Sequence, residues 1–532
     1  MSRPFPIHRR TVLAAAAALL PSTAWLKERA MSTVEERSLS DLQTELAAGS
    51  ISAHRLVADY TARIERIDRD GPRLSSVIEL NPDAPAIARV LDAERRAKGP
   101  RGPLHGLPIL IKDNIDTHDR MQTTAGSLAL VGSKPPADAF IVQRLRAAGA
   151  VILGKTNLSE WANIRSSQST SGWSARGGLT RNPHALDRNC SGSSSGSAAA
   201  VAASLCAAAV GSETDGSILS PASICGIVGL KPTVGLLSRS GIIPIAHSQD
   251  TAGPMARTVR DCALLLGAMA GIDADDPAMQ GNPGPKLTDY TSALDAKALL
   301  GARLGVARQF FGFHDQTEIA YAPVLVALQK AGAVLVDPVT LPAIDTINDA
   351  EMTVLLYELK ANLAAYLQRL GPEAPVKSLA DVIAFNKQNA TREMAWFGQD
   401  LFEKAQAKGP LTDAAYLDAR AMCLRIARTE GIEAVMREHQ LDAIIAPTGG
   451  PAWRNDTVIG DHFVGSSTTA AAVAGTPAIT VPAAMLRGLP LGLTFFGNAW
   501  SEARLLGLAY AFEQATHARR APAYVASVDL PR

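Results

Sequence analysis

The stretch NCSGSSSGSAAAVAASLCAAAVGSETDGSILSPAS, residues 189–223, contains the most informative pattern in the chain. It places two polar turns, residues 191–197 and 213–217, on either side of a run of alanine and other small residues. Alanine has the highest helix propensity, so residues 197–210 are predicted to form a closely packed, buried helix. The flanking turns can aim hydroxyl and backbone N–H groups at one point, and Gly216 permits a close backbone approach. Composition alone favours two flexible Ser/Gly linkers, since serine and glycine are common in loops.

The segments before this stretch alternate between helix and strand patterns. Ser52 can cap a helix whose apolar residues, as far as Ile67, fall on one stripe. The apolar run 108–111 predicts a short buried strand that ends at Lys112, whose side chain can emerge at the strand terminus. A helix over residues 138–148 and a strand over residues 151–153 continue the alternation, which is typical of an α/β sheet.

The segments after this stretch continue the same organisation. Residues 338–441 are mostly helical in pattern and carry charges throughout, which indicates a helical insertion. Strands are predicted over residues 443–447, 478–482 and 491–496, and a final helix over residues 502–516. Repeats, low-complexity linkers and charge boundaries are absent from the sequence, so we expect a single large α/β domain.

The composition excludes several functional classes. The 532 residues include 52 Lys+Arg and 51 Asp+Glu, so the overall charge indicates neither nucleic acid nor anionic lipid as a partner. Five cysteines form no C-x-x-C pair and cannot all pair within the chain, which argues against a disulfide framework or a zinc site. We interpret them as buried or partly buried thiols and expect no metal. A small neutral molecule or a peptide is the expected substrate.

The N-terminus has the features of an export signal. Arg9-Arg10 precedes a short apolar run, residues 12–20, and a signal peptidase could cut after Ala24. We therefore predict a twin-arginine signal over residues 1–24, a mature domain over residues 25–532 and a periplasmic location. The apolar run is far shorter than the roughly 20 residues that span a bilayer, so no stable membrane anchor is expected. The alternative is a disordered, basic N-terminus.

Residues 149–156, GAVILGKT, match the P-loop pattern. A phosphate-binding loop follows a strand and precedes a helix, whereas this segment follows a predicted helix and contains apolar, strand-forming residues where the loop should be. We therefore do not interpret it as a nucleotide site.

Residues 192–196, GSSSG, match the nucleophile elbow of α/β-hydrolases, with Ser194 as the attacking residue. An elbow requires a strand before it, and residues 181–189 are instead polar and turn-forming. An esterase that uses Ser194 is nevertheless retained as the rival hypothesis. Its general base would be one of the downstream histidines: His247, His439, His462 or His517.

Four segments resemble motifs of the amidase signature family. Lys112 in LPILIKDN matches the family lysine, and LGKTNLSEWAN, residues 153–163, matches the segment that follows it. Ser193 in GSSSGS matches the bridging serine, and Ser217 in TDGSI matches the nucleophile. The two serines are separated by 217 − 193 = 24 positions, which is the family spacing. Weaker similarity reaches the final helix, so the resemblance covers nearly the whole predicted mature chain.

The resemblance implies a central mixed β-sheet covered by helices on both faces, and a cofactor-free amidase. Ser217 would attack the amide carbonyl, while Ser193 would pass its proton to Lys112, which must therefore start neutral. The backbone N–H groups of Thr214, Asp215, Gly216 and Ser217 would form the oxyanion hole. Asn163 and Ser194 are the candidate substrate-binding residues, and the segment around residues 161–178, together with the helical insertion, would shape the pocket.

The chain departs from the common family pattern at three positions. Asp215 stands where many members have glycine, Ser195 replaces another glycine, and Leu219 stands where many have arginine after the nucleophile. These residues and GIIPIAHSQDTAGPM, residues 241–255, resemble the branch that includes bacterial peptide amidases. The branch implies C-terminal peptide amides or related small amides as substrates, and we expect a monomer or homodimer. Two further hypotheses are a non-catalytic binding protein on this scaffold and a transamidating subunit like that of glutamyl-tRNA amidotransferase.

Overall fold

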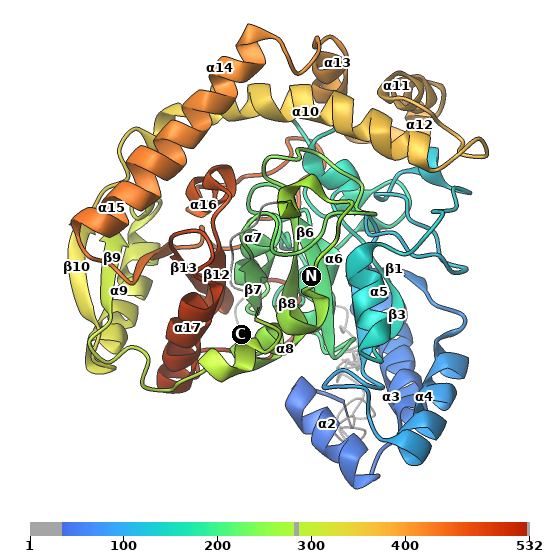
Figure 1. Ribbon diagram of the computed structural model, residues 1–532, viewed down its shortest axis with the longest axis horizontal. Coiled ribbons are helices and arrows are strands. Elements are labelled where there is room, and N and C mark those ends of the chain that lie inside the picture. The colour runs from blue at the N-terminus through green and yellow to red at the C-terminus, as the bar shows by residue number, and fades with distance from the viewer. Residues whose placement is uncertain (1–33, 281–286, 529–532) are drawn as a thin grey trace, which may run out of the picture.

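A computed structural model describes residues 34–280 and 287–528. The predicted signal, residues 1–24, and the predicted start of the mature domain at residue 25 lie outside the described residues. Within them, eleven strands form one sheet in the order β1-β3-β2-β6-β8-β7-β12-β13-β11-β9-β10 (Figure 1). These strands are β1 (Val77–Leu80), β2 (Pro108–Lys112), β3 (Val151–Thr156), β6 (Ala208–Glu213), β7 (Val228–Lys231), β8 (Thr251–Ala256), β9 (Arg303–Ala307), β10 (Val334–Val339), β11 (Ala443–Pro447), β12 (Ala478–Leu486) and β13 (Leu489–Phe496).

Helices account for most of the remaining regular structure. The α-helices are α2 (Leu39–Ala48), α3 (Ala53–Arg63), α4 (Ala84–Lys98), α5 (Phe140–Ala147), α6 (Ser195–Ala202), α7 (Leu219–Ile224), α8 (Val259–Met269), α9 (Asp315–Lys330), α10 (Asn348–Arg369), α11 (Leu379–Gln388), α12 (Ala390–Glu393), α13 (Asp400–Gln406), α14 (Ala414–Cys423), α15 (Glu433–Glu438), α16 (Thr468–Ala474) and α17 (Glu502–Thr516). Two π-helical segments, η1 (Ile64–Asp70) and η8 (Leu424–Ile432), continue α3 and α14. The remaining short segments are the 3₁₀ turns η2 (Leu128–Leu130), η3 (Glu160–Asn163), η4 (Pro277–Met279), η5 (Tyr290–Ala293), η6 (Arg308–Phe310) and η7 (Ile344–Thr346), and a separate pair of strands, β4 (Trp173–Ser174) and β5 (Gly178–Leu179).

The main sheet is mixed, and its parallel part positions the site. β2 pairs in parallel with β3 on one side and with β6 on the other, whereas β8 is antiparallel to both β6 and β7. Parallel neighbours end at the same edge of a sheet. The last residue of β2, Lys112, therefore lies at the same edge as the end of β6 and the polar turn that follows it.

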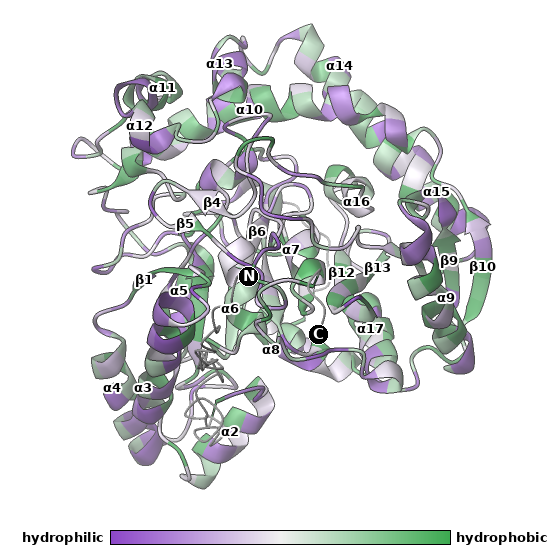
Figure 2. Ribbon diagram, turned by 180° about the vertical axis from the view of Figure 1, so that it is seen from behind, coloured by the Kyte–Doolittle hydropathy of each residue, from purple (hydrophilic) through white to green (hydrophobic). Residues whose placement is uncertain are grey.

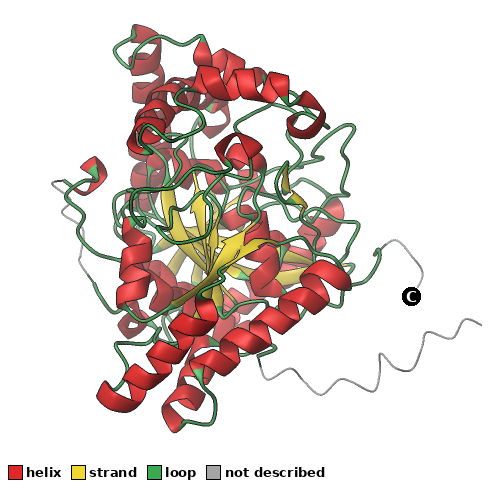
Figure 3. Ribbon diagram, turned by 90° about the vertical axis from the view of Figure 1, so that its right-hand side faces the viewer, coloured by secondary structure: helices red, strands yellow, loops and turns green. Residues whose placement is uncertain are grey.

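The sheet is enclosed by helices, as predicted. Helices α8, α9 and α17 contact one another or the sheet, while α6 and α7 form a second group against it. Viewed from the side, helices lie on both sides of the central strands (Figure 3). The surface helices α5 and α10 alternate between polar and apolar residues along their length (Figure 2). The predicted fold class, one large α/β domain with a mixed central sheet, is confirmed.

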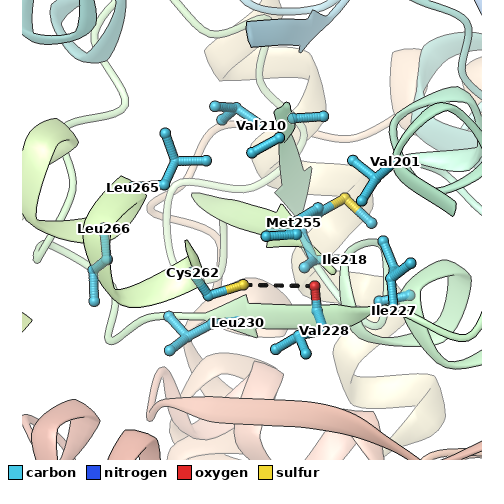
Figure 4. Packing of buried hydrophobic residues seen from close by; sticks show 14 of the residues in the cluster. Val201, Val210, Ile218, Ile227, Val228, Leu230, Met255, Cys262, Leu265 and Leu266 are labelled. Atoms are coloured by element: carbon cyan, nitrogen blue, oxygen red, sulfur yellow. Dashed lines mark hydrogen bonds between the residues drawn. The ribbon is translucent and has the colours of Figure 1, made fainter. Parts of the chain in front are cut away.

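A continuous apolar core supports the centre of the sheet. Val210 of β6, Met255 of β8 and Cys262 of α8 are among its fully buried members (Figure 4). All five cysteines are buried free thiols, as predicted from the sequence. Ile218 directly follows the polar turn 213–217 and belongs to the same core. Its packing therefore holds the C-terminal end of the turn in place.

The local predictions are correct for most elements but wrong for residues 197–210. The helix predicted there ends at Ala202, Ser204 adopts a φ of +54°, and the second half of the run is strand β6. Helix propensity differs among ordinary residues by less than about 1 kcal/mol, so tertiary pairing overrides it. Here Ala208, Ala209 and Val210 complete the sheet beside β2, and their small side chains fit its crowded centre.

The helical insertion forms an arch along one side of the molecule. Helices α10 to α15 lead from the edge strand β10 back to β11, and Figure 1 shows α10 and α14 side by side across the top of the sheet. The predicted cap of the early helix is also present, since Ser52 Oγ accepts the N–H of Arg55. Within the described parts of the chain, no helix has both the length and the apolar character needed to cross a bilayer.

Candidate active site

Lys112 lies at the end of β2 with its side chain completely buried. Its Nζ donates hydrogen bonds to Ser193 Oγ at 2.7 Å, to Ser212 Oγ at 3.0 Å and to the Ser212 carbonyl at 3.1 Å. A lysine ammonium has three donors, and these three acceptors can use all of them. The lysine is thus held in one position and aimed at Ser193.

The pKa of Lys112 is strongly perturbed. Burial disfavours the charged ammonium and lowers the pKa from 10.5 to about 7, although the carboxylates of Glu213 and Asp250 act in the opposite direction. At neutral pH a large fraction of Lys112 is therefore the free amine, which can accept a proton. The neutral lysine that the family resemblance requires is consistent with this environment.

Ser193 is fully buried and precedes helix α6. The Gly192–Ser193 peptide bond is cis, and the Ser193 carbonyl accepts the N–H of Ser159 at 3.1 Å. A Cβ atom at position 192 would lie 2.1 Å from Ser159 Oγ, so only glycine fits before this serine. The Ser/Gly-rich turn is therefore a tightly packed structure and not a flexible linker.

The second polar turn, residues 213–217, is held by its own carboxylates. Glu213 is buried, and its Oε2 accepts the N–H groups of Ile218 at 2.7 Å and Leu219 at 3.0 Å. Thr214 Oγ1 donates to Asp250 at 2.5 Å. These bonds fix the backbone on both sides of Ser217. The φ of Gly216 is +73°, a conformation that favours glycine.

Two departures from the common family pattern have a clear structural role. The Asp215 carboxylate accepts hydrogen bonds from Thr468 Oγ1 at 2.7 Å and Thr469 Oγ1 at 2.6 Å, so it ties the turn to the start of α16. Leu219 is fully buried in an apolar cluster with residues of α16, including Ala470. A charged arginine would be unpaired in that cluster, which explains leucine at this position.

Ser217 lies between strand β6 and helix α7, and 7% of its surface is exposed. Its carbonyl accepts the N–H of Ser194 at 3.0 Å, which joins the two polar turns. Within residues 34–280 and 287–528, the backbone N–H groups of Asp215, Gly216 and Ser217 are hydrogen-bonded to no acceptor. Three neighbouring donors therefore remain available to a ligand beside the Ser217 hydroxyl.

Ser194 differs from what the nucleophile-elbow hypothesis requires. Its hydroxyl is fully buried, donates to the Ser212 carbonyl at 3.1 Å and accepts the Ser212 N–H at 3.2 Å. No strand directly precedes it, since the described chain runs as a loop from β5 to α6. The rival esterase hypothesis is therefore unsupported. Ser194 connects the two turns, and its hydroxyl faces backbone, whereas we predicted a substrate contact.

Asn163 lies in the irregular turn η3, where Trp161, Ala162 and Asn163 all have positive φ angles. Its Nδ2 donates to Ser171 Oγ at 3.0 Å, and its buried Oδ1 has no partner in the described structure. Asn163 and Ser171 both line a cavity beside the two polar turns. The segment predicted to shape the substrate pocket therefore lines this cavity.

Sequence reasoning missed three residues of the site. Ser212 contacts Lys112 through two atoms, and its Oγ also accepts from Asn114 Nδ2 at 2.9 Å. Glu213 fixes the turn through backbone bonds. Asn114 belongs to the quoted motif LPILIKDN and Glu213 to the polar turn 213–217, but neither was assigned a role; Ser212 lies in no quoted motif. The only signal for Ser212 is its place between the predicted helix 197–210 and the polar turn 213–217, where the structure has the end of strand β6.

Two cavities adjoin the polar turns. One of about 230 Å³ is lined by Gly192 and Gly216, the residues that directly precede Ser193 and Ser217. The other, of about 290 Å³, is lined by Asn114, Ser212 and Thr214, and by Asn362 of the helical insertion. Because the first cavity is lined by the residues that directly precede both predicted reactive serines, it is the better place for a reacting group.

Known proteins share both the sequence pattern and the fold of this chain. The model of the family described as Amidase matches residues 55–506. A probable amidase from Arabidopsis thaliana is 40% identical over 93% of this chain and 93% of its own length. A glutamyl-tRNA(Gln) amidotransferase subunit from Ralstonia nicotianae is 38% identical over 91% of this chain and 99% of its own length. The structure of the peptide amidase from Stenotrophomonas maltophilia superposes with a TM-score of 0.88 at 52% identity, covering 92% of this chain and 99% of that one.

Proposed function

The chain belongs to the amidase family, and we propose that it hydrolyses a carboxamide through an acyl-enzyme formed on Ser217. The observation that carries the proposal is the buried Lys112, whose Nζ lies 2.7 Å from Ser193 Oγ at the sheet edge where the Ser217 turn begins. A buried amine next to a hydroxyl is a proton acceptor that needs no histidine, metal or organic cofactor.

The contact between Lys112 and Ser193 supports one half of the proton path, and the path as a whole is the following. Ser217 Oγ attacks the amide carbonyl, Ser193 takes the Ser217 proton and passes its own to the neutral Lys112. The same path then returns a proton to the departing nitrogen, so ammonia leaves and an ester to Ser217 remains. Water hydrolyses this ester by the reverse sequence. The lowering of the pKa from 10.5 to about 7 raises the neutral fraction of Lys112 at pH 7 from about one in 3,000 to about one half.

The oxyanion that forms in the reaction needs donors in place before the attack. The N–H groups of Asp215, Gly216 and Ser217 support this role, because they belong to a rigid turn and have no acceptor in the described structure. Removal of a single oxyanion donor typically costs about 3 to 4 kcal/mol of transition-state stabilisation. The Glu213 and Asp215 carboxylates act indirectly by fixing the turn.

We propose C-terminal peptide amides or related small amides as the substrate class. The 52% identity to a peptide amidase, against 38% to an amidotransferase subunit, supports hydrolysis over transamidation. The presence of Lys112, Ser193 and Ser217 argues against a non-catalytic protein on this scaffold. Ammonia release should be measured across amidated peptides, free-acid controls and simple amides. We expect the highest kcat/KM with amidated peptides; a preference for simple amides would overturn the substrate class but not the amidase activity.

We also propose export by the twin-arginine route, which rests on Arg9-Arg10 and the apolar run at residues 12–20. Replacing both arginines with lysine keeps the charge but removes the motif. We expect the variant to stay in the cytoplasm of a bacterial host, as measured by amidase activity in separated periplasmic and cytoplasmic fractions. Unchanged periplasmic delivery would disprove this route.

A further inference from the structure

The loop of residues 448–467, between β11 and α16, forms one wall of the cavity beside the reactive serines. Trp453 and Phe463 from this loop line the cavity together with Gly192 and Gly216. The two rings meet edge to face, with centroids 5.6 Å apart and an interplanar angle of 87°. Trp453 is 8% exposed and Phe463 is 49% exposed, so the pair joins the buried part of the cavity to solvent.

The aromatic pair is held in place by a partly buried carboxyl group. Asp461 Oδ1 accepts Trp453 Nε1–H at 3.1 Å, and both Asp461 oxygens lie 3.1 Å from the Ser171 backbone nitrogen. These bonds connect the loop to the segment that contains Asn163. Asp461 itself lines the cavity and, with Asp215, gives it two carboxyl groups. These two carboxyl groups would repel an acidic ligand, whereas their oxygens could accept a hydrogen bond from a peptide N–H.

The same loop exposes further apolar side chains. Val458 is 87% exposed, Ile459 is 73% exposed, and Val464 is 51% exposed. The turn that carries the first two is ordered, because Asp456 Oδ1 accepts their N–H groups at 2.8 and 2.9 Å. The loop that lines the cavity through Trp453 and Phe463 thus also presents apolar side chains to solvent, as a surface that contacts an apolar ligand would.

We propose that loop 448–467 is the subsite for the acyl side of a peptide substrate, where Trp453 and Phe463 select an apolar side chain near the reacting amide. This inference rests on the proposed amidase function and specifies its substrate: amidated peptides that are apolar and uncharged or basic near the reacting end. Two observations support this substrate preference. The aromatic pair lines the same cavity as Gly192 and Gly216, and two carboxyl groups also line that cavity. Acidic peptide amides should be poor substrates.

The test compares Phe463→Ala with wild type on amidated peptides that carry leucine or aspartate near the amide, and on propionamide. We expect kcat/KM for the leucine peptide to fall about tenfold, mainly through KM, because an aromatic contact with the substrate is lost. Propionamide lacks a peptide side chain that could contact the ring, so its kcat/KM should fall much less than that of the leucine peptide. Phe463→Leu should restore most of the loss, and the wild type should prefer the leucine peptide to the aspartate peptide.

The matched control is Val90→Ala on helix α4, a 65% exposed apolar residue outside the lining of this cavity, which should leave all rates unchanged. Equal losses for Phe463→Ala on the peptide and on propionamide would overturn the subsite, as would an unchanged peptide rate. The subsite can also be tested without turnover. The dissociation constant of a fluorescent amidated peptide is measured for Ser217→Ala and for the double variant that also carries Phe463→Ala. A tenfold weaker binding there would support the subsite even if the wild type released no ammonia, so the two proposals fail separately.

Discussion

Replacing Ser217 with alanine is expected to abolish ammonia release, with kcat falling by roughly 10⁴-fold or more, while the fold is retained. The hydroxyl is the only group lost, and it is the proposed nucleophile, so no acyl-enzyme can form. Ser217 contributes its carbonyl to the bond with Ser194 N–H, and alanine preserves that bond. Ammonia release from an amidated peptide measures the activity, and circular dichroism with thermal unfolding checks the fold.

Ser194→Ala provides the comparison for this experiment. It removes two hydrogen bonds to Ser212, so we expect a lower melting temperature and a reduced but measurable activity. A nucleophile at position 194 would produce the opposite order, with activity lost in Ser194→Ala and retained in Ser217→Ala. Covalent labelling by a serine-reactive probe should likewise disappear only in the Ser217 variant.

Lys112→Met is expected to lower kcat/KM by roughly 10³-fold or more, because it removes the proton acceptor and keeps most of the length of the side chain. The folded structure should persist, since methionine fills the buried space and carries no charge. The variant leaves Ser193 Oγ and Ser212 Oγ without the amine that now orients them. Steady-state ammonia release at pH 8 is the measurement. Activity within tenfold of wild type would show that Lys112 is not in the proton path.

The pH dependence of wild type provides a second readout for Lys112. Only the neutral amine accepts a proton, so activity should be low where Lys112 is an ammonium and rise as pH increases. With the folded pKa lowered from 10.5 to about 7, kcat/KM should rise tenfold per pH unit below pH 7 and level off above it. Any residual activity of Lys112→Met should not show this rise with pH below pH 7. A wild-type rise centred near pH 10 would mean that the lysine is solvated and unperturbed.

Much of the site could be predicted from local sequence. Lys112 follows an apolar strand, and Ser193 and Ser217 sit in Ser/Gly-rich turns at a family spacing, so motifs alone were sufficient to name them. Ser212 could not be found in this way, and the role of Asn114, although it lies in the motif LPILIKDN, could not be assigned. The contacts of Ser212 with Lys112 and with Asn114 join residues about 100 positions apart, and they exist only because β2 and β6 lie side by side.

The wrong prediction for residues 197–210 has the same origin. Ala208, Ala209 and Val210 are compatible with a helix by propensity, and their place between β2 and β8 depends on partners far away in the chain. The contacts of Asp215 with α16 are a similar case, since Thr468 and Thr469 lie more than 250 positions away. Such distant partners cannot be identified from the local sequence around either segment.

Periodicity, turn residues and motif spacing are local properties, so they were enough to predict the α/β class, the strand that ends at Lys112 and the chemical types of the candidate reactive residues. Which polar groups share one buried edge of the sheet depends instead on how distant segments pack. That packing removes Lys112 from water, which lowers the pKa of the amine to about 7, and it fixes the Ser217 turn through Glu213 and Asp215. Desolvation depends on everything that surrounds a group, so it arises only when the chain has folded.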